Sequence, residues 1–146
     1  MARHTGVLVP LFSCSSTTSW GIGDLGDLAP MAAWLAAGGQ RVMQLLPLNE
    51  MAPGQHSPYS AISAMAIDPI FIRVPDVPEF DAIGGEVALG AADRDELERV
   101  RRAPRIDYAA VRRLKSDWLR VTFDRYVDRE WRRETKRARS LRRFID

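Results

Sequence analysis

Apolar residues in the first part of the chain recur in three short blocks that predict a strand, a helix and a second strand. Residues 6–11 form a short apolar run ending around a proline, which is typical of a strand. From Leu25 the apolar residues recur at helical spacing, and Asp24 just before them is a helix-capping residue. Gly38-Gly39 predicts the end of this helix. Residues 42–46 are too few for a helix, and we interpret them as a strand buried on both faces.

The order strand, helix, strand predicts parallel pairing through a helical crossover. In parallel α/β sheets and barrels, ligands bind at the carboxyl ends of the strands. We therefore expect the loop of residues 47–63 to lie on the functional face. A β-branched run at residues 70–74, bounded by prolines, predicts a further short strand. We expect residues 75–80 to be extended and residues 84–90 to be a loop.

The pattern changes at residue 93, where two amphipathic helices are predicted. The first begins among acidic residues and ends before Pro104, and the second begins near Asp107 and fades after Trp131. We accordingly divide the chain into residues 1–92, carrying the strands, and a helical, basic segment of residues 93–146. The last residues include an apolar set with nothing after it, which suggests that the sequence was cut from a longer one: Leu141, Phe144 and Ile145.

Length and composition restrict the class of protein. The chain has 146 residues, of which 46% are hydrophobic and 27% charged, as in soluble globular proteins. It is too short for a complete eight-stranded α/β barrel, which needs about 250 residues. No apolar run reaches the roughly 20 residues that span a bilayer, and the N-terminus does not have the pattern of a signal peptide. We therefore expect a cytoplasmic protein without a membrane partner, and its single cysteine, Cys14, excludes an internal disulfide.

The net charge of +2 hides two parts of opposite charge. Residues 1–92 hold three basic and eight acidic side chains, whereas residues 93–146 hold eighteen basic and eleven acidic ones. The basic segment could bind the phosphates of a nucleic acid. However, acids are interleaved with the arginines, which favours solvated helix faces carrying pairs three or four residues apart. We therefore expect no nucleic-acid partner.

Few polar residues point to chemistry individually. Asp24 is a possible catalytic acid, but a helix cap explains it fully, and Glu50 is better explained as an exposed loop charge than as a ligand-binding group. His56 and Ser57 are adjacent, yet neighbours in sequence rarely point at each other, and a third orienting group is not evident. The spacing of His4, Cys14 and His56 does not fit a metal site. Tyr59 either stacks on a sugar ring or packs on the proline before it, and the residues leave both readings open.

Several motifs occur in an order that resembles the amino-terminal part of the 4-alpha-glucanotransferases, a family also called amylomaltase or disproportionating enzyme. The resemblance is clearest over residues 3–74 and again over residues 106–119. The motifs are Gly6-Val7-Leu8, Trp20-Gly21-Ile22-Gly23-Asp24-Leu25-Gly26, Gly39-Gln40-Arg41-Val42-Met43-Gln44-Leu45-Leu46-Pro47-Leu48, Ser57-Pro58-Tyr59-Ser60, Ser63-Ala64 and Ile106-Asp107-Tyr108.

The resemblance implies an α/β fold: the amino-terminal part of a (β/α)8 TIM-type barrel followed by a helical insertion. It implies an enzyme of glycogen or starch metabolism that transfers α-1,4-glucan segments between maltooligosaccharides with retention of configuration, using two carboxylates about 5 Å apart. In the family these acids come from later strands, so we expect no catalytic residue, metal or cofactor in this chain, and no activity from it alone. Ser57 and Tyr59 carry over as sugar-binding residues.

Some positions depart from the family pattern near the sugar-binding cleft. Ser60 stands where the family usually has Gln, and Asp68 stands where it has the Asn of a Phe-Ala-Gly-Asn-Pro motif. Two other functions remain as alternatives. One is a non-catalytic glucan-binding or regulatory fragment, and the other is a small basic nucleic-acid-binding protein.

Overall fold

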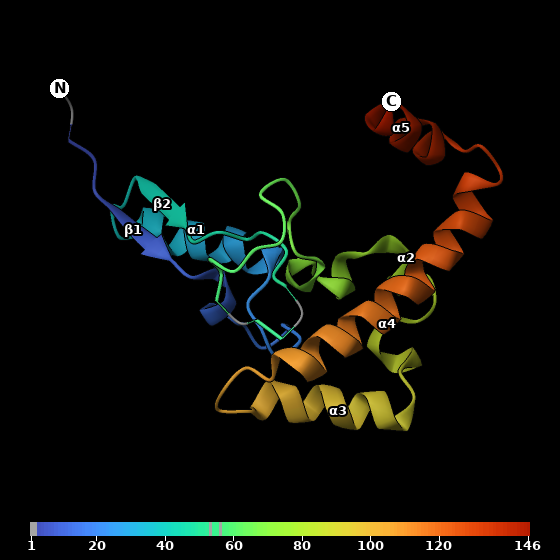
Figure 1. Cartoon of the computed structure of the whole chain (residues 1–146), viewed down its shortest axis with the longest axis horizontal. Helices are drawn as coiled ribbons and strands as arrows, with labels where there is room; N and C mark the ends of the chain where they lie inside the picture. The colour runs from blue at the N-terminus through green and yellow to red at the C-terminus, as the bar shows by residue number, and fades with distance from the viewer. Residues whose placement is uncertain (1–2, 53, 56) are drawn as a thin grey trace.

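The computed structural model describes residues 3–52, 54–55 and 57–146. Among these residues the sheet has two parallel strands, β1 (Gly6–Val9) and β2 (Val42–Leu45), paired in register from Gly6–Val42 to Val9–Leu45. Helix α1 (Leu28–Ala37) connects them. The predicted strand, helix, strand order and the parallel pairing are confirmed, so both strands end at the same edge of the sheet (Figure 1).

Helix α1 begins and ends where the sequence predicts. Asp24 accepts a hydrogen bond from the Gly26 N–H at 3.1 Å, and Asp27 accepts one from the Asp24 N–H at 2.9 Å, which completes a reciprocal capping box. The first turn, Leu25–Asp27, is a 3₁₀ helix, η2. Gly39 follows the helix with φ +78°, a left-handed conformation that glycine adopts without strain.

The expectation that residues 42–46 are buried on both faces is wrong for this chain. Val42 is 52% exposed, and the residues of β2 alternate between exposed and half-buried. A parallel strand is buried only when other strands and helices cover it. In the described part of the chain, β1 is the only strand that pairs with β2.

The strand predicted at residues 70–74 and the extended segment predicted at 75–80 are also wrong. The structure has two 3₁₀ helices here, η3 (Pro69–Phe71) and η4 (Val74–Asp76), followed by the short helix α2 (Pro78–Asp81). Each of the three turns has a proline at its first or second position. Proline has the φ of a helical turn and does not need to donate a hydrogen bond there.

Most of the described chain beyond residue 84 is helical, and two of its helices were predicted. Helix η5 (Gly85–Ala88) replaces the expected loop, and α3 (Ala91–Arg102) and α4 (Tyr108–Tyr126) match the two predicted amphipathic helices. Helix α4 continues as a π-helix, η6 (Val127–Trp131). A further helix, α5 (Lys136–Ile145), begins at Thr135, whose side chain caps it.

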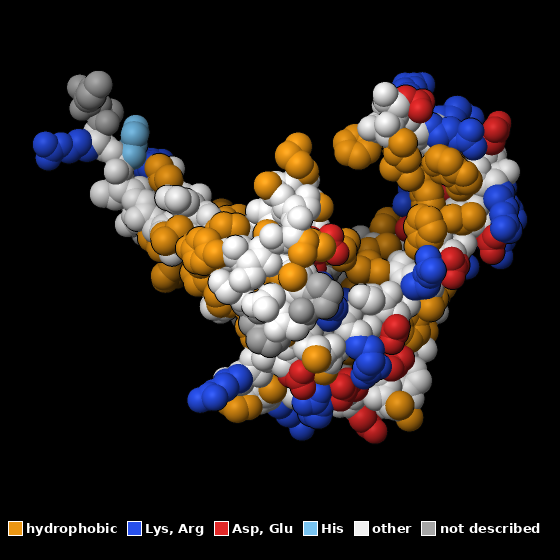
Figure 2. All heavy atoms as spheres, in the orientation of Figure 1, with side chains coloured by type: hydrophobic (Ala, Val, Ile, Leu, Met, Phe, Trp, Pro, Cys, Tyr) orange, Lys and Arg blue, Asp and Glu red, His pale blue; other side chains and the backbone are white. Residues whose placement is uncertain are grey.

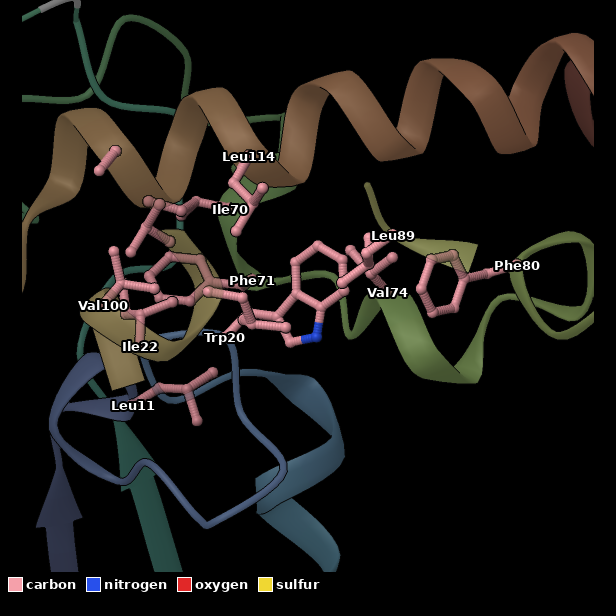
Figure 3. Packing of buried hydrophobic residues seen from close by; sticks show 13 residues of the cluster. Leu11, Trp20, Ile22, Ile70, Phe71, Val74, Phe80, Leu89, Val100 and Leu114 are labelled. Carbon is pink, nitrogen blue, oxygen red and sulfur yellow. The ribbon is translucent and has the colours of Figure 1, made fainter. Parts of the chain in front are cut away.

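The hydrophobic core lies where the loops leaving the two strands meet α3 and α4. Figure 3 shows Trp20 near its centre, among residues from both the strand-bearing and the helical segments. Phe80 packs edge-on against Trp20 and against Trp118, with ring centroids 5.6 and 5.7 Å apart. The buried residues are Leu11, Trp20, Ile22, Ile70, Phe71, Val74, Phe80, Leu89, Leu97, Val100, Ala110, Val111 and Leu114.

The described chain has a curved outline. The sheet and α1 form one arm, α4 runs away from them, and α5 lies at its far end (Figure 1). Between the two arms the loop that follows β2 projects from the body, with hydrophobic side chains near its tip (Figure 2). No helix within residues 3–52, 54–55 and 57–146 combines the length and the apolar character needed to cross a membrane.

Candidate functional site

The loops that follow β1 and β2 meet at the carboxyl edge of the sheet. Phe12 from the first loop and Pro47 and Pro58 from the second line the same small cavity, together with Tyr108 of α4. The structure therefore places Pro58 beside the loops that leave both parallel strands. The carboxyl edge is the one at which α/β proteins bind their ligands.

Ser57 and Tyr59 form a tight turn on this edge. The Tyr59 N–H donates to the Ser57 hydroxyl at 3.3 Å, and the Ser60 N–H donates to the Ser57 carbonyl at 3.0 Å. The Tyr59 side chain is 74% exposed, so its ring presents most of its surface to solvent. Ser57 shapes the turn, and Tyr59 is accessible to a ligand. His56 lies outside the described residues.

The segment of residues 46–68 that carries this turn is called here the sugar loop, after the sugar-binding role expected from the sequence, and its described residues form a narrow hairpin. Isolated antiparallel bridges join Asn49 to Ile67 and Met51 to Ala61. Its limbs are closed by backbone hydrogen bonds of 2.9 to 3.1 Å. The donor–acceptor pairs are Glu50 N–H to Ala66, Ile62 N–H to Glu50, Ala52 N–H to Ser60 and Asp68 N–H to Leu48. The sequence had indicated a loop here, but not this pairing.

Asp68 lies at the base of the sugar loop and is 0% exposed. Its carboxylate accepts hydrogen bonds from the Ile70 N–H at 3.0 Å and the Met51 N–H at 3.3 Å. Arg112 of α4 donates to both of its oxygens, at 2.9 and 2.7 Å. Burial alone raises the pKa of Asp68, but these hydrogen bonds and the charge of Arg112 together hold the pKa below its ordinary value of 3.8.

A second buried charge cluster joins the η2 turn, the segment from η3 to η4, and α4. Arg73 donates from Nε to Asp24 at 2.8 Å and also pairs with Asp27. The Lys115 ammonium donates to the Ile70 and Ile72 carbonyls at 2.8 and 2.9 Å, and it lies 3.4 Å from Asp24. The interpretation of Asp24 as a helix cap is confirmed, because its carboxylate binds a helix N–H and two cations and does not face an open cavity.

The pKa values in this cluster are shifted by burial and by the partners together. Burial lowers the pKa of Lys115, and the neighbouring Asp24 carboxylate offsets part of the shift. Burial raises the pKa of Asp27, but hydrogen bonds from Ser16, Asp24 and Ser19, with the charge of Arg73, hold it below 3.8. Asp27 is therefore ionised near neutral pH in the folded structure, whereas burial works against the charged form of Lys115.

Each buried acid in the described chain forms an ion pair with an arginine. Asp24 and Asp27 bind Arg73, Asp68 binds Arg112, and Glu79 binds Arg137 at 2.6 Å. A carboxylate held in this way is a poor nucleophile and a poor general acid. Sequence reasoning missed these partners because they are distant in the chain. The one available signal was the presence of acids in stretches that are otherwise apolar.

Two further cavities lie beside Tyr108 of α4, and one of them is lined partly by the sugar loop. One of about 360 Å³ lies under it, lined by Glu50, Met51, Gly54, Gln55, Ile62, Tyr108, Ala109 and Arg112. Glu50 is thus half-buried beside Arg112, whereas the sequence had favoured an exposed charge. The other, of about 520 Å³, lies between the serine-rich loop after β1 and the α3–α4 turn. Both volumes lie within the range of small-molecule sites.

The basic helices carry the ion pairs that their charge pattern predicts. Pairs three or four residues apart join Arg99 to Glu96, Arg102 to Glu98, Arg113 to Asp117 and Arg132 to Asp128. Such pairs are typical of solvated helix faces. In the part of the chain that the structure describes, no group of three or more His, Cys, Asp or Glu residues could hold a metal ion.

Comparison with known proteins gives one consistent result. A family model described as 4-alpha-glucanotransferase matches residues 9–146. A 4-alpha-glucanotransferase of Chlamydia pneumoniae is 37% identical over 120 residues, which cover 82% of this chain and 22% of that protein. The Haemophilus influenzae 4-alpha-glucanotransferase is 31% identical over 126 residues, covering 82% of this chain and 18% of that protein.

A plant protein is also similar. The 4-alpha-glucanotransferase DPE2 of Oryza sativa subsp. japonica is 30% identical over 128 residues, covering 83% of this chain and 13% of that protein. The chain thus spans 22% or less of the length of each of these three relatives. The resemblance carried by the ordered motifs is confirmed, because the family match extends over nearly the whole chain. The chain belongs to the 4-alpha-glucanotransferase family.

Proposed function

We propose that this chain contributes a strand–helix–strand unit and an adjoining helical segment to a (β/α)8 barrel enzyme. That enzyme transfers α-1,4-glucan segments between maltooligosaccharides. Family membership supports the activity, and the parallel β1–α1–β2 unit supports the barrel, which is built from repeats of such a unit. The whole protein's substrates are then maltooligosaccharides or other α-1,4-glucans.

Within this enzyme the sugar loop binds glucan through Ser57 and Tyr59. The observation that carries this role is the exposed ring of Tyr59, held by Ser57 in a defined turn next to the loops that leave two parallel strands. An aromatic ring offers a flat apolar face to the C–H side of a sugar, and the hydroxyl of tyrosine adds a hydrogen bond. A packed tyrosine, the other reading of this residue, would be largely buried.

The reacting carboxylates are supplied from outside this chain. A retaining transfer needs a nucleophile and an acid/base group about 5 Å apart and open to the sugar. The buried acids of the described residues are bound to cations instead. The role of this chain is therefore to bind and orient the glucan, while the chemistry belongs to the complete barrel.

Titration calorimetry of the full 146-residue chain with maltoheptaose tests this function. We expect Tyr59→Ala to weaken binding roughly tenfold, because a sugar–aromatic contact of about 1.4 kcal/mol is lost. Tyr59→Phe keeps the ring and should retain most of the affinity. Phe144→Ala removes another exposed ring, on α5, and should leave binding unchanged.

The same preparation mixed with maltotriose should form neither glucose nor longer oligosaccharides. Binding that is equal in the wild type and Tyr59→Ala would contradict the role of Tyr59. Efficient transfer by the chain alone would contradict the proposal that its acids are not catalytic.

A further inference from the structure

The sugar loop has little hydrophobic anchoring of its own. Most of its described side chains are exposed or half-buried, including Met65 at 94% exposure. Within residues 46–52, 54–55 and 57–68, the buried side chains are Met51 and Asp68. Figure 2 shows the loop projecting between the two arms of the molecule. A segment with so few buried contacts opens easily unless polar contacts hold it.

Asp68 makes those polar contacts. Its N–H donates to the Leu48 carbonyl at 2.9 Å, and its carboxylate accepts the Met51 N–H, so one residue joins the two limbs of the loop. The same carboxylate accepts the Ile70 N–H, which links the returning limb to the buried helix η3. Both oxygens also bind the Arg112 guanidinium, in the two-point geometry that gives arginine–carboxylate pairs their directionality.

Arg112 extends from a helix that is packed into the core. It lies on α4, whose neighbouring residues Val111 and Leu114 are fully buried in the core. Its side chain also lines the cavity under the sugar loop, beside Glu50. The ion pair thus connects the largely exposed sugar loop to a helix that is packed into the core.

We propose that the Asp68–Arg112 ion pair positions the sugar loop, and with it Ser57 and Tyr59, against α4. Both are positioning residues: they act through the loop and do not themselves bind the sugar. The inference rests on the proposed function in that the positioned turn is taken to be the glucan-binding one.

Amide hydrogen exchange of the full chain tests the inference without any ligand. The reporters are the N–H groups of Glu50, Ala52 and Ile62, which close the loop, and the N–H of Leu114 in α4 reports the core. Asp68→Asn and Arg112→Gln should each speed exchange at the loop reporters by tenfold or more, with little change at Leu114. The double variant should be no faster than either single one, since all three lack the same contact.

Arg113→Gln is the matched control. Arg113 is next to Arg112 on α4 but pairs near the surface with Glu96 and Asp117, so its loss should leave the loop reporters unchanged. Arg112→Lys keeps the charge without the two-point geometry and should give intermediate exchange. Unchanged exchange at the loop in Asp68→Asn would overturn the proposal. A parallel rise at Leu114 would also overturn it, because that pattern means global destabilisation.

Calorimetry with maltoheptaose separates this inference from the proposed function. If the wild type binds the glucan, Asp68→Asn and Arg112→Gln should weaken binding at least threefold, and Arg112→Lys should restore part of it. A loosened loop with unchanged affinity would overturn the positioning role. If the wild type does not bind glucan, the proposed function fails, and the exchange data still decide whether the ion pair holds the loop.

Discussion

Asp24 shows which contacts of a residue can be predicted from its neighbours in sequence. Its role as a helix cap was predicted from those neighbours, and the structure confirms it. The two cations that it binds could not be predicted in this way, because Arg73 is 49 residues away and Lys115 is 91 residues away. Lys115 is 1% exposed, although lysine is rarely buried without partners. Its charge is accommodated because Asp24 and two backbone carbonyls surround it.

We expect Lys115→Met to lower the free energy of unfolding by about 3 kcal/mol, because the buried Ile70 and Ile72 carbonyls lose their donor and Asp24 loses a cation. Urea denaturation measures the change. The chain's other lysine, Lys136, is exposed, and Lys136→Met should change the free energy by less than about 0.5 kcal/mol. Equal effects of the two substitutions would show that the buried contacts of Lys115 contribute nothing.

At the scale of elements, α1, α3 and α4 were predicted from the sequence, and one predicted strand is replaced by 3₁₀ turns. The β-branched run at residues 70–74 has the composition of a strand, but its turns are 3₁₀. A strand needs a neighbour to accept and donate its hydrogen bonds. Here the Ile70 and Ile72 carbonyls, which lie two residues apart as in a strand, bind Lys115 instead. The tertiary partner therefore overrode the local preference.

Helix α5 gives an element-scale prediction. The Thr135 hydroxyl accepts a hydrogen bond from the Ala138 N–H at 3.3 Å and donates to Glu130. Thr135→Ala should therefore destabilise α5 by about 1 kcal/mol, seen as faster amide exchange at residues 138–141. Thr135→Ser keeps the hydroxyl and should lose less than half as much. An equal loss in both variants would mean that the threonine methyl, and not the cap, holds the helix.

The whole molecule is held together by one core and by ion pairs between distant segments. Residues before and after position 93 share the core, and Asp68–Arg112, Glu79–Arg137 and Glu86–Arg101 each cross that position. The residues of β2 are exposed or half-buried and do not belong to this core. The stability of the described chain therefore depends on the helical segment and the loops much more than on the sheet.

This dependence predicts sensitivity to acid. The folded-state pKa values of Asp27, Asp68 and Glu86 lie below their ordinary values of 3.8 and 4.5. For Glu86, burial raises the pKa, but the hydrogen bonds from Arg101 and Trp20 outweigh this effect and lower the pKa overall. The unfolded chain therefore takes up protons first as the pH falls. The stabilisation that these groups provide is fully present well above pH 4.5, and it is lost as the pH falls through their folded-state pKa values.

Urea midpoints measured from pH 7 to pH 3 should fall steadily below about pH 5. The Asp68→Asn variant should show a smaller fall than the wild type, because one of the linked carboxylates is absent. A midpoint that is constant down to pH 3 would contradict the assignment of these ion pairs to the folded state.

The sequence by itself determined the strand–helix–strand order, the cap and end of α1, the two long helices and the family. These depend on residues within a turn or two of each other and on motifs read in order. The tertiary structure alone decided which cations bind Asp24 and Asp68, the turns at residues 69–81, the hairpin of the sugar loop and the exposure of β2. Each depends on groups brought together from distant parts of the chain, because a buried charge or carbonyl binds whichever partner the packed fold places beside it.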